Sequence, residues 1–201
     1  MVKLYKNFNI KNNHKNSLIL IGNFDGVHLG HQKLFKLAKL FKKKYKIKIG
    51  VVNFDPMPKM FFNKLLKNFR ITSINQKIEL LSKLKVDFII TKKFDKKFSK
   101  TKSINFIKEI LNKKLKSKFI FVSNNFRFGN KREGNVKLLV ENEKKFNFKV
   151  IKPEPLVKQQ KIISSTLIRS LLEKGYLKKA NKLLDRNWTI DGKVQKGRQV
   201  G

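Results

Sequence analysis

Two histidines, His28 and His31, stand three residues apart in the segment HLGH, after an apolar run and a glycine-containing turn. At the start of a helix, side chains with this spacing can point the same way. The two imidazoles then add hydrogen-bond donors to the unpaired backbone N–H groups and the positive dipole end of the helix, which together can bind an anion. Gly30 lets the backbone approach a ligand closely. Such donors suit a triphosphate whose α-phosphorus is attacked, because negative charge grows on the departing pyrophosphate.

Two other interpretations of the histidines are weaker. A zinc site is not favoured, because HxxH lacks a third ligand nearby. Two surface histidines are the plain alternative, but the preceding apolar strand and the GNFD turn favour a phosphate site.

A second segment, residues 163–169 (ISSTLIR), combines hydroxyls with an arginine. Ser164 or Ser165 can cap the helix that follows, and Thr166 and Arg169 lie on one helical face. Hydroxyls, helix-start N–H groups and a guanidinium suit phosphate oxygens. The alternative is a plain N-cap with a surface arginine, although the chain has only six arginines.

Two further segments carry aromatic side chains. Residues 124–134 (NNFRFGNKREG) follow the apolar run FIFVS and offer rings for stacking, amides and glycines. Residues 52–58 (VNFDPMP) form a strand that ends in a proline-stiffened turn, which suits the wall of a flat ring. A core phenylalanine and an ordinary turn are the alternatives, because the chain has 18 phenylalanines.

The elements that must position these segments alternate along the chain, which indicates an α/β protein with a parallel sheet and right-handed crossovers. Strands are expected at residues 18–22, 47–54, 88–91, 119–123 and 148–151. Helices are expected at residues 30–42, 74–84, 103–115, 135–145, 165–174 and 177–184, with a capping box of Ser73 and Gln76. Ligands of such sheets bind beyond the carboxyl ends of strands, at a switch in strand order.

Length and composition limit the class of protein to which the chain can belong. The chain has 201 residues, 40% of them hydrophobic, which suits one sizeable domain. It has no apolar run long enough for a membrane span, no secretory signal and no cysteine, so we expect a cytoplasmic location without disulfides.

The net charge of +36 suggests a binder of nucleic acid or of an anionic membrane. However, the lysines are spread over the whole chain, and Asn, Ile and Phe are abundant as well. This favours compositional drift of the coding sequence, with weak, non-specific polyanion binding as a side effect.

In this order, the four segments resemble the adenylyltransferase half of bacterial FAD synthetase, the bifunctional riboflavin kinase/FMN adenylyltransferase. The family pattern has GNFDGVHLGH, a TF(D/E)PHP-like turn, VG(E/D)(N/D)FRFGxxRxG and ISSTxIR. This chain has GNFDGVHLGH, NFDPMP, VSNNFRFGNKREG and ISSTLIR. The resemblance continues through LLEKGYLKKANKLLDRNW, similar to the family's helical connector, and covers roughly residues 17–201.

The resemblance implies a Rossmann-like nucleotidyltransferase fold with a parallel sheet and a short C-terminal helical connector. It implies an FMN adenylyltransferase, in which the FMN phosphate directly attacks the α-phosphate of ATP to give FAD and pyrophosphate. Mg²⁺ would accompany ATP, and FMN and FAD would be substrate and product. No metal site of the protein's own is expected, and the sequence does not indicate an oligomeric state.

The family's functional residues map onto this chain position by position. His28, His31 and Arg169 would be catalytic. The ATP-binding residues would be Gly22, Asn23, Phe24, Asp25, His28, His31, Asn125, Ser164, Ser165, Thr166 and Arg169. The flavin-binding residues would be Phe54, Asp55 and Phe128.

The chain departs from the family pattern at three places. Met57 stands where histidine is frequent, and Ser123 and Asn124 replace a glycine and an acidic residue. Residues 192–201 look like the opening of the kinase half. We therefore expect an adenylyltransferase domain over residues 1–186, with the connector at 164–186. Residues 187–201 would be a truncated, poorly packed kinase segment without riboflavin kinase activity.

Two alternative functions stay open. One is a related nucleotidyltransferase with another phosphate acceptor, and the other is a basic nucleic-acid-binding module. A decayed, inactive fragment is a further possibility, which the intact motifs argue against.

Overall fold

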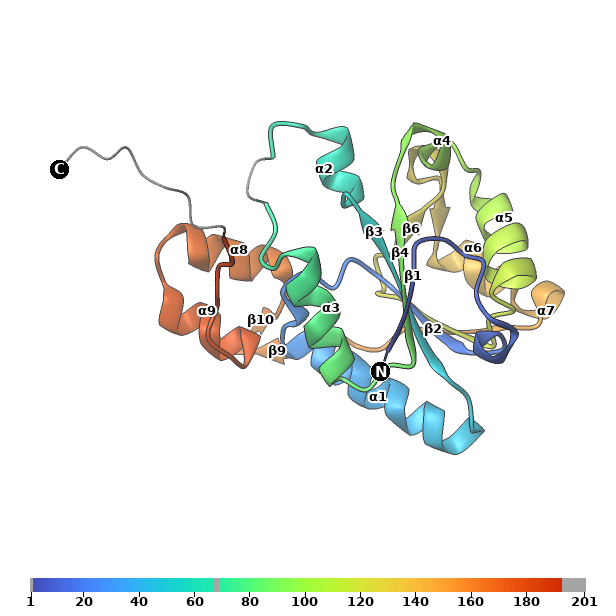
Figure 1. The fold of residues 1–201 in the computed structure, drawn as a ribbon, viewed down its shortest axis with the longest axis horizontal. Helices are drawn as coiled ribbons and strands as arrows, with labels where there is room; N and C mark the ends of the chain where they lie inside the picture. The colour runs from blue at the N-terminus through green and yellow to red at the C-terminus, as the bar shows by residue number, and fades with distance from the viewer. Residues whose placement is uncertain (1, 67–68, 193–201) are drawn as a thin grey trace.

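Parallel strands form the central sheet of the computed structural model, which describes residues 2–66 and 69–192 (Figure 1). Across the sheet the order is β1 (Lys3–Tyr5), β4 (Phe88–Lys93), β3 (Ile49–Asp55), β2 (Leu18–Ile21), β5 (Phe119–Phe121) and β8 (Lys149–Ile151). Every neighbouring pair in this sheet is parallel. The parallel α/β fold that the alternating pattern predicts is therefore confirmed.

Helices cover both faces of the sheet (Figure 1). On one face lie α1 (Leu29–Tyr45) and α3 (Ile74–Lys83). On the other lie α5 (Ser103–Asn105), the π-helix η3 (Phe106–Lys114), α6 (Val136–Glu141) and α7 (Glu143–Phe146). The capping box is present at the start of α3, since Ser73 Oγ accepts from the Gln76 N–H and Gln76 Oε1 accepts from the Ser73 N–H.

Shorter elements connect these layers. Helices α2 (Pro58–Phe62) and α4 (Lys96–Ser99) follow β3 and β4, and 3-10 turns span η1 (Asn12–His14), η2 (Asp25–Val27) and η4 (Asn130–Arg132). Two small antiparallel hairpins pair β6 (Arg127–Phe128) with β7 (Gly134–Asn135), and β9 (Val157–Lys158) with β10 (Lys161–Ile162).

Three local features differ from the expectations. The edge strand β1 was not predicted, because three partly exposed residues give no apolar run. The expected helix at 103–115 is mostly a π-helix, and the one at 135–145 is broken at Asn142.

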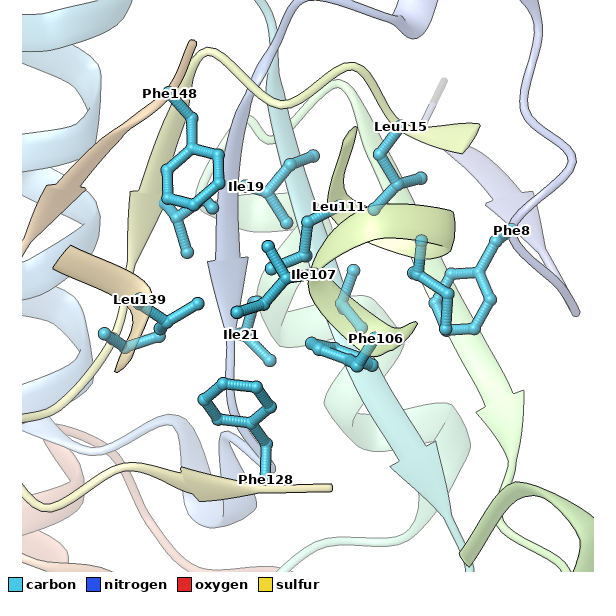
Figure 2. Close-up of a cluster of buried hydrophobic side chains, with 14 of the residues drawn as sticks. Phe8, Ile19, Ile21, Phe106, Ile107, Leu111, Leu115, Phe128, Leu139 and Phe148 are labelled. Carbon is cyan, nitrogen blue, oxygen red and sulfur yellow. The ribbon is translucent and has the colours of Figure 1, made fainter. Parts of the chain in front are cut away.

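The core lies in two layers, because side chains alternate between the faces of each strand. Ile19, Ile21 and Val52 face the layer of η3 and α6, where Figure 2 shows Phe106, Leu111, Phe128 and Leu139 gathered around the sheet. Leu18, Leu20 and Val51 face the layer of α1 and α3. Both faces of β2 and β3 are thus packed against helices, and these strands provide a fixed base for the turns that follow them.

A third apolar cluster fastens the C-terminal helices α8 (Ser165–Glu173) and α9 (Leu177–Leu184) to the domain. Ile168, Ala180 and Leu184 are buried in it together with Ile71. Trp188 packs against the same cluster and its Nε1 donates to the Ile71 carbonyl at 2.8 Å. The expectation of poor packing from residue 187 onward is therefore wrong at Trp188, and residues 193–201 lie outside the described part.

Candidate active site

The turn after β2 lies where the strand order reverses. From β2 the chain proceeds through β3 and β4 toward one edge of the sheet, and β5 then pairs with the other side of β2. Crevices at such a switch point are the usual ligand sites of parallel sheets. Residues 22–31 begin here, with the Gly22 N–H donating to the Val52 carbonyl at 3.1 Å.

The backbone of this turn is strained. Phe24 and Val27 have φ values of 47° and 41°, and Gly26 has a φ of 78°. The left-handed region suits glycine but is rare for a β-branched residue such as valine. Strain of this kind costs about 1–3 kcal/mol for each residue and persists only where the surroundings enforce it.

The carboxylate of Asp25 holds the turn in place. It is almost completely buried, and it accepts hydrogen bonds from the backbone N–H groups of Ile71 and Thr72 at 3.1 and 3.3 Å. It also pairs with Arg169 Nη2 at 3.1 Å. Asp25 therefore joins the turn, the segment before α3 and helix α8, which explains how the surroundings enforce the strained backbone.

Arg169 is anchored in this structure. Its Nε donates to the Phe69 carbonyl at 2.9 Å, and its guanidinium stacks on the Phe69 ring at 3.9 Å. Together with the ion pair to Asp25, these contacts hold the Arg169 side chain against the turn. If Arg169 also binds a phosphate, it does so while keeping this structural role.

His28 and His31 form a stacked pair at the start of α1. Their ring centroids are 3.7 Å apart and their planes are inclined by 23°. Burial, and to a lesser extent Arg169 and Arg186, lower the pKa of His28 to about 4 despite the opposing effect of Asp25. Burial, His28 and Lys77 lower the pKa of His31 well below its usual value. Both imidazoles are therefore neutral at pH 7, and each can donate one hydrogen bond.

The ISST segment packs directly on the HLGH segment. A Cβ added at Gly30 would lie 3.0 Å from the Ile163 carbonyl oxygen, so only glycine fits there without a shift. Ser164 Oγ caps α8 by accepting from the Leu167 N–H at 3.2 Å, and Ser165 Oγ donates to the Asp25 carbonyl at 2.9 Å. Thr166 is exposed beside them. Two segments that are far apart in the sequence are thus in direct contact.

Of the other residues predicted to bind ATP, Phe24 is buried beside the histidines, whereas Asn23 and Asn125 are exposed. Phe24 is buried and its ring meets the His31 ring edge-on at 5.3 Å. Asn23 is exposed at the turn. Asn125 is also exposed, and its Oδ1 accepts from Ser123 Oγ at 2.9 Å. The structure therefore joins the segments 22–31 and 163–169 by direct contacts, whereas the contact found for Asn125 is within its own loop.

An aromatic cavity of about 490 Å³ opens on the other side of β3. Phe54 and Phe128 line it, together with Phe94, Phe98, Phe106 and Phe126. Arg127, Lys131 and Arg132 add positive charge to its wall. Because side chains alternate along β3, Phe54 faces this cavity while Asn53 and Asp55 face the layer of α1 and α3.

Asp55, the last residue of β3, and Met57, in the turn after it, do not line the cavity. Asp55 instead forms an ion pair with Arg70, and Met57 is buried. The predicted flavin set is therefore divided, with Phe54 and Phe128 in the cavity and Asp55 on the opposite face.

Three polar residues on the side of the sheet covered by α1 and α3 were not predicted as site residues. Asn53 and Lys77 are buried, and Arg70 is half-buried beside Asp55. Arg70 stands out in sequence only as one of six arginines, and Lys77 is one of many lysines. Asn53 interrupts an otherwise apolar strand, a signal that could have identified it.

Within residues 2–66 and 69–192, no group of three or more His, Cys, Asp or Glu side chains has the arrangement to hold a metal ion. In the same described residues, no helix is both long and apolar enough to cross a membrane.

A parallel sheet with a histidine-containing turn at its switch point is the arrangement of a Rossmann-like nucleotidyltransferase fold. The sequence profile of the family described as FAD synthetase matches residues 10–167. The chain belongs to this family.

Curated relatives agree with this assignment. The chain is 44% identical, over 96% of its length, to the bifunctional riboflavin kinase/FMN adenylyltransferase of Buchnera aphidicola subsp. Acyrthosiphon pisum, of which it spans 62%. It is 33% identical to the Escherichia coli K12 protein of the same description, covering 92% of this chain and 59% of that protein. It is 30% identical to the FAD synthetase of Listeria monocytogenes, with 92% and 75% covered.

Solved structures give the same fold. A Streptococcus pneumoniae structure described as a macrolide-efflux protein has a TM-score of 0.78 and 25% identity, covering 93% of this chain and 60% of that one. A pantoate-β-alanine ligase from Francisella tularensis has a TM-score of 0.54 at 14% identity, covering 91% and 86%, and shares the fold alone.

Proposed function

We propose that this chain is an FMN adenylyltransferase, which transfers the adenylyl group of ATP to the phosphate of FMN and releases pyrophosphate. The observation that carries the proposal is the packing of the ISST segment on the HLGH turn, through Gly30, Ile163 and Ser165. This contact joins two helix N-termini, two histidines and several hydroxyls in one place. Such a set of donors is suited to phosphate oxygens.

The phosphate side of the reaction needs positioning and charge stabilisation. The FMN phosphate would attack the α-phosphorus directly, so one P–O bond forms while the bond to pyrophosphate breaks. His28 and His31, as neutral donors, would bind the oxygens that gain charge. Ser164, Ser165, Thr166 and Arg169 would approach the phosphates from α8, and Asn23 and Asn125 would contact the nucleotide. Mg²⁺ would enter with ATP as part of the substrate.

The aromatic cavity supports a flavin as the acceptor. Its volume of about 490 Å³ and its phenylalanine rings suit a large flat ring system, since such ligands bury most of their surface in apolar pockets. Arg127, Lys131 and Arg132 on its wall would attract the FMN phosphate. A small acceptor such as phosphocholine would leave most of this apolar surface without contacts.

A panel of acceptors tests the proposal. Purified protein is incubated with ATP, Mg²⁺ and one of FMN, riboflavin, phosphopantetheine or phosphocholine, and pyrophosphate release is measured. We expect release with FMN only, with FAD as the second product. Release with another phosphate acceptor in place of FMN would contradict the proposed acceptor, and no release with any of them would contradict the proposed reaction.

A further inference from the structure

Buried polar atoms without a hydrogen-bond partner gather in one part of the molecule. In the described residues, seven buried side-chain N and O atoms lack a partner, and six of these atoms belong to His28, His31, Asn53, Arg70 and Lys77. Folded proteins pair the great majority of such atoms, so a concentration of unpaired ones needs an explanation. His28 is the N-cap of α1 and His31 lies in its first turn, Asn53 lies on β3, and Lys77 lies on α3. Arg70 belongs to the segment that leads into α3.

Lys77 is the most costly member of this group. Its side chain is 1% exposed, and its Nζ has no partner among the described residues. Burial lowers its pKa, while Asp25 opposes this effect. An ammonium group taken out of water without a counter-charge costs several kcal/mol. Natural sequences retain such groups mainly at functional sites.

The charges around Lys77 do not compensate it. Its charged and titratable neighbours are Asp25 of the turn after β2, Asp55 at the end of β3, Arg70 before α3 and His31 on α1. Asp25 already pairs with Arg169, and Asp55 already pairs with Arg70. Each carboxylate near Lys77 therefore has an arginine partner of its own, and the surplus charge at this place is positive.

A second lysine of α3 shows the contrast. Lys83 is exposed, and it forms an i,i+4 ion pair with Glu79. This is the ordinary position of a lysine on an amphipathic helix. Lys77 faces inward on the same helix and lies close enough to His31 to lower the pKa of that histidine.

We propose that Lys77 is a further positioning residue of the phosphate site, whose missing counter-charge is supplied by the pyrophosphate portion of the bound nucleotide. Its positive charge acts on the site next to His31. The two histidines are neutral and add no net charge, so Lys77 makes the site more positive. The inference rests on the proposed function, because it takes a polyphosphate as the ligand.

Inorganic pyrophosphate is the probe that tests this role apart from catalysis. Its affinity is measured by calorimetry for the full chain and for the variants Lys77→Met and Lys83→Met, which lose the same net charge. We expect Lys77→Met to bind pyrophosphate about ten- to hundredfold more weakly, the loss of one charged partner. Lys83→Met should bind it within about twofold of the unchanged protein, since exposed charges contribute little.

Two further readouts separate this role from a structural one. Without ligand, Lys77→Met should melt at the same temperature as the unchanged protein or higher, because replacing an uncompensated buried charge by an apolar chain does not destabilise. In the FAD-forming reaction, it should have a lower kcat and a higher KM for ATP, with an unchanged KM for FMN. Lys77→Arg, which keeps the charge, should recover part of the pyrophosphate affinity.

The following results would overturn the inference: unchanged pyrophosphate binding in Lys77→Met, a much lower melting temperature of that variant without ligand, or no recovery in Lys77→Arg. Failure of the unchanged protein to bind pyrophosphate would overturn it as well. If the protein binds pyrophosphate but forms no FAD, the proposed function fails, and the comparison of the lysine variants still decides the role of Lys77.

Discussion

His28 and His31 combine burial with neutrality. Stacked at 3.7 Å, the two rings could not both carry a proton without strong repulsion, and their burial disfavours even one charge. They can therefore act as fixed hydrogen-bond donors whose charge does not change near pH 7. A site of this kind needs its positive charge from elsewhere, namely from the start of α1 and, as we propose, from Lys77.

The lowered pKa of His28 predicts an acid-sensitive stability. Between the usual pKa of 6.5 and the folded value of about 4, the unfolded chain binds more protons at this position than the folded one. The contribution of neutral His28 to the free energy of unfolding is therefore fully present above pH 6.5. It is lost as the pH falls toward 4, and the loss is on the order of 3 kcal/mol. Urea denaturation of the unchanged protein and of His28→Asn, at pH 7 and pH 4.5, measures this difference. Parallel losses of stability in the two proteins would contradict the assignment.

At the scale of single residues, the sequence predicts side chains that belong to contiguous motifs. His28, His31, Gly30 and Ser164 stand in short patterns whose spacing has a local meaning, and the structure brings them together. Lys77 carries no such pattern, because its importance comes from its burial and from charges on other elements. Burial of one lysine among many cannot be derived from composition or local spacing.

At the scale of elements, Asp25 connects three segments that are far apart in the chain. The turn after β2, the approach to α3 and helix α8 meet at its carboxylate. Arg186 adds a further link, since its Nη2 donates to the Gly26 carbonyl at 2.8 Å. The C-terminal helices and Arg186 thus help to hold the strained turn in place.

Removing the charge of Asp25 should destabilise the domain. In Asp25→Asn the half-buried Arg169 loses its counter-charge, and we expect a loss of about 3 kcal/mol in the free energy of unfolding, measured by urea denaturation. Asp95→Asn is the matched control, because Asp95 caps α4 at the surface and asparagine caps equally well. Equal stability of the two variants would show that Asp25 is not the connection we describe.

Elements with strong local signals were predictable, and those set by tertiary packing were not. The apolar runs of β2 and β5 and the capping box of α3 are visible in sequence. The π-helix η3 has a periodicity that cannot be told from an α-helix, and β1 exists only because β4 offers it an edge. The cavity beside β3 depends on which face Phe54 occupies, which requires the register of the sheet.

At the scale of the whole molecule, the chain carries a net charge of +36, and beside the histidine turn Arg70, Lys77 and Arg169 outnumber Asp25 and Asp55. A field of this sign attracts anions from solution, which include the proposed substrates ATP and FMN as well as other polyanions. The contact of Trp188 with Ile71 extends the packed unit past residue 186, where we expected the domain to end. The boundary of the adenylyltransferase unit over residues 1–186 remains our proposal, with this contact as the reason to include Trp188 in any shortened protein.

The charge predicts weak nucleic-acid binding that is independent of the histidine site. Affinity for a random DNA duplex should fall steeply between 50 and 200 mM salt, by roughly three orders of magnitude or more for a protein with many phosphate contacts. His28→Ala/His31→Ala should bind the duplex equally well, because the lysines that cause the attraction are spread over the surface. Salt-insensitive, sequence-specific binding in a fluorescence-anisotropy titration would instead support a nucleic-acid-binding module.

We propose above that the histidine turn after β2 promotes adenylyl transfer to FMN. The most direct measurement is chromatographic quantification of FAD and pyrophosphate formed from FMN, ATP and Mg²⁺, by the unchanged protein and by the folded His28→Ala/His31→Ala variant. We expect equimolar FAD and pyrophosphate with the unchanged protein, and a rate lower by about three orders of magnitude in the variant, because two donors to the transition state are lost. No FAD from the unchanged protein, or a near-full rate in the variant, would contradict it.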